Sequence, residues 1–291
     1  MKQRIITAIV GIVVLVAVLT QFYSPLFNVA GLITYAIAVH EIRNTFKEKN
    51  SLAVFIMLDI VGRYFFLDKY IPRANTFVVL VFAFAAYAFI SVFEFEKIDI
   101  KVVSSSILFG LYVLFGFYCL VNYNTVLPKE KYGYDGFFIL AICFFIAWGS
   151  DAFAYFAGFL FGKHKMAPVL SPKKTIEGAV GAFIGTAVCT VLFVLLYCSF
   201  KNGMQAEDYI NKVSPKLIFW IVMVSMAGTF IEIIGDLFAS AVKRQTGIKD
   251  YGNLLPGHGG ILDRFDSVIL LAPFFFIIAI YISKIGGIFF V

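Results

Sequence analysis

The chain has 291 residues, of which 61% are hydrophobic and 14% are charged, and its mean hydropathy is +0.90. Soluble domains carry roughly 45–50% apolar and about 25% charged residues, so this composition excludes a soluble enzyme, a disordered chain and a nucleic-acid-binding domain. The net charge of +6 therefore calls for an explanation in terms of membrane topology rather than nucleic acid. The sequence predicts an all-α, polytopic integral membrane protein.

Nine apolar segments are candidates to cross about 30 Å of hydrocarbon, at 1.5 Å of rise per helical residue. They are residues 5–23, 26–40, 52–67, 76–95, 103–121, 136–161, 177–200, 217–240 and 267–290. Pro25 separates the first two, and the third contains Asp59 and Arg63, which are four residues apart and able to pair on one helix face. Lys2 and Arg4 suggest a signal peptide, but no small-residue cleavage site follows, so we expect a retained first span.

Lysine and arginine in the connecting loops predict the orientation. The loops on the N-terminal side hold fifteen of the 24 Lys and Arg residues, and the opposite loops hold seven. Because cytoplasmic loops are enriched in these residues, we expect a cytoplasmic N-terminus in the cell membrane and an external C-terminus. We expect residues 1–135 to form about five membrane helices. Residues 136–291 would form a catalytic region of about four helices with cytoplasmic loops 162–176 and 241–266. The four cysteines lie in apolar stretches and are expected to be free.

The densest polar stretch runs from residue 235 to 266. If one helix continues through it, Glu232, Asp236, Ser240 and Lys243 share a stripe, and Asp263 and Asp266 share a face at the start of the last span. Carboxylates at a bilayer edge are costly unless they are paired or bind an ion, and hard oxygen ligands suit Mg²⁺. Basic residues lie between these acids: Lys243, Arg244, Lys249 and Arg264.

A glycine-rich loop, Pro256-Gly-His258-Gly259-Gly260, precedes a helix that we expect to begin near Ile261. Glycines let backbone N–H groups approach an oxyanion, and a helix N-terminus adds positive potential. Together with the acids and bases, the loop predicts a nucleotide or polyphosphate site. The chain has no G-x-x-x-x-G-K-[ST] sequence, so this is not a P-loop ATPase.

A second polar cluster, at 171–178, is expected on the same side of the membrane. Ser171 and Pro172 are interpreted as the cap and first residue of a helix, with Lys173 and Lys174 in its first turn. Lysines there oppose the helix dipole unless an anion is bound, so we expect phosphate contact, the alternative being lysines placed only by topology. Asp151, inside the sixth span, either binds substrate or makes a helix–helix hydrogen bond.

These motifs resemble the signature of the phosphatidate cytidylyltransferases, or CDP-diacylglycerol synthases. The resemblance starts at Ser240-Ala-Val-Lys243-Arg244, continues through Lys249-Asp250, and ends with Pro256-Gly-His258-Gly259-Gly260-Ile-Leu-Asp263-Arg264-Phe-Asp266. Upstream, Asp151 with Tyr155, residues 162–168 and the 171–178 segment with Thr175 are similar to further motifs of the family. Ile176 stands where the family usually has an aromatic residue. The resemblance covers about residues 147–272.

The resemblance implies that CTP and phosphatidate give CDP-diacylglycerol and pyrophosphate with Mg²⁺, and that the protein is a homodimer. In the family the metal-binding acids correspond to Asp236 and Asp263, and we add Lys243 and Arg244 as catalytic residues whose positive charge holds phosphate groups. A second cation stays open. The expected substrate-binding residues are Asp151, Ser171, Lys173, Lys174, Thr175, Ser240, Lys249, Asp250, His258, Gly259, Gly260, Arg264 and Asp266.

Some roles stay open at this point. Asp266 and Arg264 form either a second ion site or a structural pair, and His258 is interpreted as a hydrogen-bonding residue rather than a general base. A CTP-dependent lipid kinase is an alternative that only the reaction products distinguish. An ion-coupled transporter is another alternative, but its acids would lie near the membrane midplane rather than gather at one face.

Overall fold

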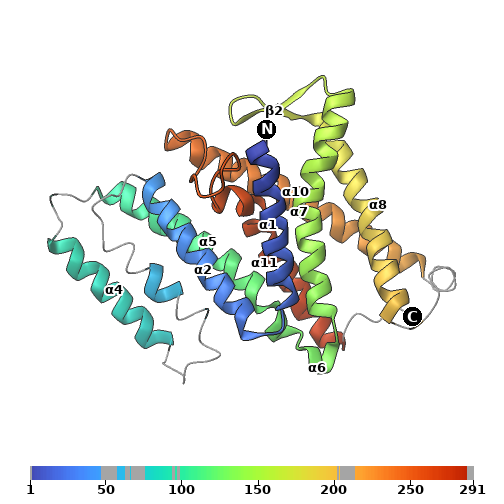
Figure 1. Cartoon of the computed structure of the whole chain (residues 1–291), viewed down its shortest axis with the longest axis horizontal. Coiled ribbons are helices and arrows are strands. Elements are labelled where there is room, and N and C mark those ends of the chain that lie inside the picture. Colours follow the sequence, from blue (N-terminus) through green and yellow to red (C-terminus); the bar gives the residue numbers. More distant parts are fainter. Residues whose placement is uncertain are drawn as a thin grey trace. The chain divides into compact units, whose positions relative to one another are not determined.

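The computed structural model describes residues 2–46, 58–62, 66, 76–93, 96, 99–201, 203 and 214–286. Helices account for most of these residues, and one small antiparallel sheet interrupts them (Figure 1). In chain order the elements are α1 (Lys2–Thr20), α2 (Pro25–Thr45), α4 (Thr76–Phe93), α5 (Ile100–Val126), α6 (Lys129–Tyr132), α7 (Asp135–Phe161), β1 (Lys165–Ala167), β2 (Ser171–Thr175), α8 (Ile176–Lys201), α10 (Pro215–Gln245) and α11 (Leu262–Ile285). The predicted helical membrane architecture is confirmed.

In the described part of the chain, six helices are long and apolar enough to cross a membrane: α2, α5, α7, α8, α10 and α11. Each coincides with a predicted span. Helices α1 and α4 lie on two more predicted spans, although their apolar stretches are shorter, Ile9–Thr20 and Val78–Phe93. Most of the third predicted span, including Arg63, lies outside the described residues. The total of nine spans and the cytoplasmic N-terminus stay predictions. The four cysteines all lie within these helices, and none of them forms a disulfide bond.

The start of α2 shows how sequence punctuates the helices. Pro25 occupies the first helical position, where its missing N–H group costs no hydrogen bond. Ser24 caps the helix, and its Oγ accepts a hydrogen bond from the backbone N–H of Leu26 at 3.2 Å. The predicted break between the first two spans is therefore a capped helix start.

The chain forms two compact units, described here one at a time. The first comprises residues 1–121 and 242–269. Its interior is aromatic: the buried Tyr35 ring stacks on Phe66 with centroids 5.6 Å apart, and its hydroxyl donates to the Leu58 carbonyl at 3.2 Å. Phe109 likewise stacks on Tyr251 at 5.7 Å, which packs α5 against the polar loop after α10.

The second unit comprises residues 122–241 and 270–291. Within it α7 and α8 lie side by side along much of their length (Figure 1). Hydroxyl pairs join α8 to α10: the Thr186 and Thr229 oxygens are 2.7 Å apart, and Ser225 donates to Thr190 at 3.2 Å. Such short polar side chains stabilise helix pairs in an environment where apolar packing alone has little driving force.

The hairpin before α8 corrects one prediction. Ser171 does not cap a helix, because residues 171–175 form strand β2, which pairs with β1 in the register Lys165–Thr175 and Ala167–Ser171. The helix begins at Ile176, and its first turn is capped by Thr175, whose Oγ1 accepts from the N–H of Gly178 at 3.1 Å. The pairing with β1 supplies backbone partners that the sequence of 171–175 alone did not reveal.

Candidate active site

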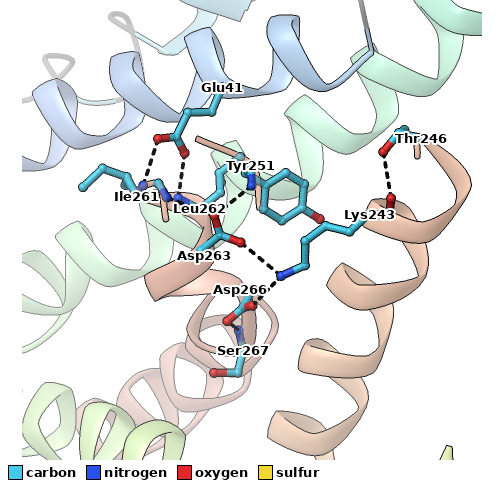
Figure 2. A network of polar contacts seen from close by, with 10 residues as sticks. Glu41, Lys243, Thr246, Tyr251, Ile261, Leu262, Asp263, Asp266 and Ser267 are labelled. Atoms are coloured by element: carbon cyan, nitrogen blue, oxygen red, sulfur yellow. Dashed lines mark hydrogen bonds and ion pairs between the residues drawn. The ribbon is translucent and has the colours of Figure 1, made fainter. Parts of the chain in front are cut away.

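Two acids of the segment 243–266 lie around the ammonium group of Lys243 (Figure 2). The Lys243 Nζ atom lies 3.1 Å from Oδ1 of Asp263 and 3.5 Å from Oδ2 of Asp266. It also lies 5.1 Å from the centre of the Tyr251 ring, a cation–π distance. We call these four residues the signature cluster. Asp263 and Asp266 occupy the first two turns of α11 on one face, as their spacing predicted, and the structure adds that one lysine pairs with both.

Asp263 is the most constrained member of the signature cluster. Its residue is 8% exposed, and its Oδ2 accepts hydrogen bonds from the N–H groups of Tyr251 at 2.8 Å and Gly260 at 2.9 Å. The loop can approach this closely because Gly259 has a φ of +80°, and a Cβ atom there would lie 2.6 Å from Oδ2. The backbone thus holds the carboxylate in one place.

The first turn of α11 has a second carboxylate, which the sequence analysis missed. Glu41 of α2 is 4% exposed and accepts from the N–H of Ile261 at 2.9 Å and of Leu262 at 2.8 Å (Figure 2). The glycine loop and helix start were predicted to face a phosphate. In the structure the N–H groups of Gly260, Ile261 and Leu262 instead donate hydrogen bonds to carboxylates of the chain itself. Substrate contact at Gly259 and Gly260 stays a prediction.

A separate group of charges in the second unit, here the hairpin cluster, consists of Lys174, Asp236 and Asp151. The Lys174 Nζ atom lies 2.7 Å from Oδ2 of Asp236 and 3.5 Å from Oδ1 of Asp151. Burial by itself lowers the pKa of Lys174, but Asp236, Asp151 and Glu232 outweigh it, so the pKa is raised. Lys174 is therefore a fixed positive charge at the end of the hairpin.

The hairpin cluster borders a pocket of about 250 Å³, lined by Ser150, Asp151, Ala154, Tyr155, Met166, Ser171, Lys173, Lys174, Thr175, Ala179, Glu232 and Ile233. The pocket brings together residues that the sequence predicted as substrate contacts, from α7 and β2: Asp151, Ser171, Lys173, Lys174 and Thr175. At its wall the buried Glu232 accepts a hydrogen bond from Ser150 through Oε2, while its Oε1 has no hydrogen-bond partner. The lining is largely apolar and carries two lysines, Lys173 and Lys174, together with two carboxylates, Asp151 and Glu232.

The remaining predicted residues differ in exposure. His258 is half-buried and its Nδ1 has no hydrogen-bond partner, while Ser240 is half-buried on α10. The others are exposed: Lys173, Arg244, Lys249, Asp250 and Arg264. Exposed cations leave their donors accessible to phosphate oxygens from water. Sequence signals for the missed residues were weak, since Glu41 is one acid at the end of a predicted span and Tyr251 is one aromatic residue among many.

A preformed metal cage is not found among the described residues, where no group of three or more His, Cys, Asp or Glu side chains could hold a metal ion. Asp236 and Asp263 are instead each balanced by one lysine. Mg²⁺ commonly binds through one or two carboxylates, with substrate phosphates and water completing its six ligands. Each of these carboxylates, taken singly, is of the kind that fits a cation whose other ligands come from a nucleotide and water.

Comparisons with known proteins agree with these features. The sequence profile of the cytidylyltransferase family matches residues 2–282. A phosphatidate cytidylyltransferase of Haemophilus influenzae is 31% identical over 293 residues, covering 94% of this chain and 97% of that protein. The phosphatidate cytidylyltransferase of Staphylococcus saprophyticus is 30% identical, covering 97% of this chain and 100% of that protein. That of Bacillus subtilis is 29% identical, covering 78% of this chain and 94% of that protein. The chain belongs to the cytidylyltransferase family.

Proposed function

We propose that this protein transfers the cytidylyl group of CTP to phosphatidate, releasing CDP-diacylglycerol and pyrophosphate. The observation that carries the proposal is the match over nearly the whole chain to proteins named phosphatidate cytidylyltransferases. The membrane helices suit a lipid substrate, and lysines held beside carboxylates suit a nucleoside triphosphate.

The chemistry of the substrates explains why charged groups dominate the two clusters. A phosphate monoester has its second pKa near about 6, so phosphatidate is mostly a dianion at pH 7 and can attack without a general base. Its attack on the α-phosphorus of CTP brings two anions together. The barrier then depends on charge neutralisation and in-line alignment, tasks for fixed cations rather than for a proton acceptor.

We assign roles to the residues on that basis. Asp236 and Asp263 are the proposed Mg²⁺ ligands, and the cation would neutralise triphosphate oxygens and the leaving pyrophosphate. Lys243 is held beside Asp263 and Asp266, where its ammonium group can pair with either the proposed metal ligands or a phosphate. Lys174 and the exposed Lys173, Arg244 and Lys249 supply further positive charge. A second cation at Asp266 stays open.

The site is proposed to face the cytoplasm, where CTP is made available, and the support is the excess of Lys and Arg in the loops on that side. The proposal that the enzyme is a homodimer is supported by the family resemblance alone. Chemical cross-linking in detergent at several protein concentrations tests it, and a single monomeric species throughout would contradict it.

The test of the activity is a reconstitution in mixed micelles with phosphatidate and CTP labelled separately at the α- and γ-phosphates, with and without Mg²⁺. We expect α-label in the lipid and γ-label in pyrophosphate, only with the metal. A lipid kinase would place the γ-label in the lipid and release CDP instead. Asp263→Asn protein serves as the matched inactive control, and transfer of γ-label would overturn the proposal.

A further inference from the structure

The carboxylate of Glu41 occupies the place where a helix N-terminus usually binds an anion. The first N–H groups of a helix have no partner within it and carry positive potential. At α11 the N–H of the first residue, Leu262, and that of the preceding Ile261 donate to the two oxygens of Glu41. A buried carboxylate is costly unless it is hydrogen-bonded, so the contact satisfies both partners.

Glycines around this carboxylate show that the loop is built to accept it. A Cβ atom on Gly252 would lie 2.6 Å from Oε1 of Glu41, and one on Gly260 would clash with the same oxygen. The loop from Tyr251 to Gly260 therefore wraps the carboxylate on one side while its N–H groups hold Asp263 on the other. Glu41 and Asp263 thus both accept hydrogen bonds from the backbone of residues 251–262.

We propose that Glu41 is a positioning residue for the reaction: it fixes the first turn of α11 and thereby the carboxylate of Asp263. The residues whose N–H groups it holds directly precede Asp263 in the chain, so a shift of that turn moves the Asp263 side chain with it. The partner comes from α2, 220 residues away in sequence, outside the region that resembles the family motifs. This inference rests on the proposed function only for its kinetic test.

Outer groups that orient ligand residues typically contribute a factor of about 10–100 in activity or metal affinity. Removing the acceptor with Glu41→Ala is expected to lower kcat by about that factor and to raise the Mg²⁺ concentration needed for half-maximal rate. Glu41→Gln keeps the size and one acceptor oxygen, so its loss should be intermediate. Thr45→Val is the matched control, since it removes a buried hydroxyl one turn further along α2 that donates to the Glu41 carbonyl.

Hydrogen–deuterium exchange of the metal-free protein provides the readout that does not depend on activity. The amides of residues 260–262 should exchange faster in Glu41→Ala than in wild type, and exchange in the rest of α2 should change little. In the Thr45→Val control, exchange of residues 260–262 should stay close to that of wild type. If faster exchange instead spreads over all of α2, or if Thr45→Val matches it, Glu41 acts through general stability and the proposal fails.

A double-mutant cycle that combines Glu41→Ala with Gly252→Ala tests whether the loop acts through the Glu41 carboxylate. When Gly252→Ala is made in wild type, the added methyl group presses on the Glu41 carboxylate and should lower kcat. In the Glu41→Ala background that space is open, so the same change should lower kcat little further. Additive losses, or a folded Glu41→Ala enzyme within about twofold of wild type, would overturn the inference. Should Glu41→Ala fail to fold, Glu41→Gln carries the test. Inactive wild type would count against the proposed function alone, because exchange still reports on the Glu41 contact.

Discussion

At the scale of single residues, the structure gives each key acid a defined counter-charge. Asp263 accepts two backbone hydrogen bonds and one from Lys243, and Asp236 is paired with Lys174. The lysines that pair with these acids lie beside the carboxylates proposed to bind Mg²⁺. The charges are thus placed before substrate binds, which reduces the reorganisation needed in the transition state.

Replacing the central acid should therefore be more harmful than replacing the histidine of the glycine loop. Asp263→Asn keeps the shape but removes the charge, and we expect turnover to fall by at least about 100-fold, the size of loss typical for a group that stabilises developing charge. His258→Gln should leave much more residual rate, because a dianionic nucleophile needs no proton acceptor. Initial rates of CDP-diacylglycerol formation check this, and the opposite order would refute the charge-neutralisation account.

Lys174 yields a prediction about pH. Because its folded-state pKa is raised, its stabilising contribution is complete below the unfolded value of 10.5 and is lost only as pH rises through the still higher folded value. Lys174→Met should lower Tm by the same amount at pH 6, 7.5 and 9, while Lys174→Arg, which keeps the charge, should lower it less. Thermal unfolding in detergent at the three pH values measures this. A Tm difference between wild type and Lys174→Met that disappears between pH 6 and 9 would contradict the prediction.

At the scale of elements, the β1–β2 hairpin and the start of α8 depend on close packing against α7. A Cβ atom on Gly178 would lie 2.7 Å from the Ala154 carbonyl oxygen of α7 and 2.9 Å from the Thr175 hydroxyl that caps α8. Glycine at this position lets α7 and α8 approach closely next to the end of the hairpin, where Lys174 lies. Local propensity alone would favour almost any other residue in the helix.

Gly178→Ala should accordingly destabilise the protein although alanine is the better helix former by about 1 kcal/mol. The matched control is Gly228→Ala in α10, where the nearest side-chain atom to an added Cβ is 3.4 Å away, an ordinary contact. We expect a lower Tm for the first variant and an unchanged or higher Tm for the second. Equal Tm values would mean that the α7–α8 contact is not tight at the hairpin.

At the scale of the whole molecule, the number of spans decides which face of the membrane each loop occupies. Nine spans with a cytoplasmic N-terminus predict a C-terminus outside, on the opposite side from the polar segments 163–175 and 241–266. An alkaline phosphatase fusion at residue 291 should be active, and one ending within 163–175 should be inactive. Green fluorescent protein at the same two points should give the reverse pattern. An inactive phosphatase at residue 291 would show an even number of spans.

The sequence by itself determined the class of protein, six of the membrane helices and the family, because apolar length, loop charge and short motifs are properties of contiguous residues. It also placed Asp263 and Asp266 on one helix face. It missed the hairpin at 165–175, where pairing between two short segments outweighed the capping signal of Ser171.

Only the tertiary structure decided which partner each charge has. Lys243 meets Asp263 because the loop between their helices folds back, and Lys174 meets Asp236 because a hairpin and a distant helix converge. Glu41 meets Ile261 and Leu262 across 220 and 221 residues. Spacing in the sequence predicts contacts within a helix, but contacts between elements depend on how the whole chain packs, and the buried carboxylates must then find donors wherever that packing leaves them.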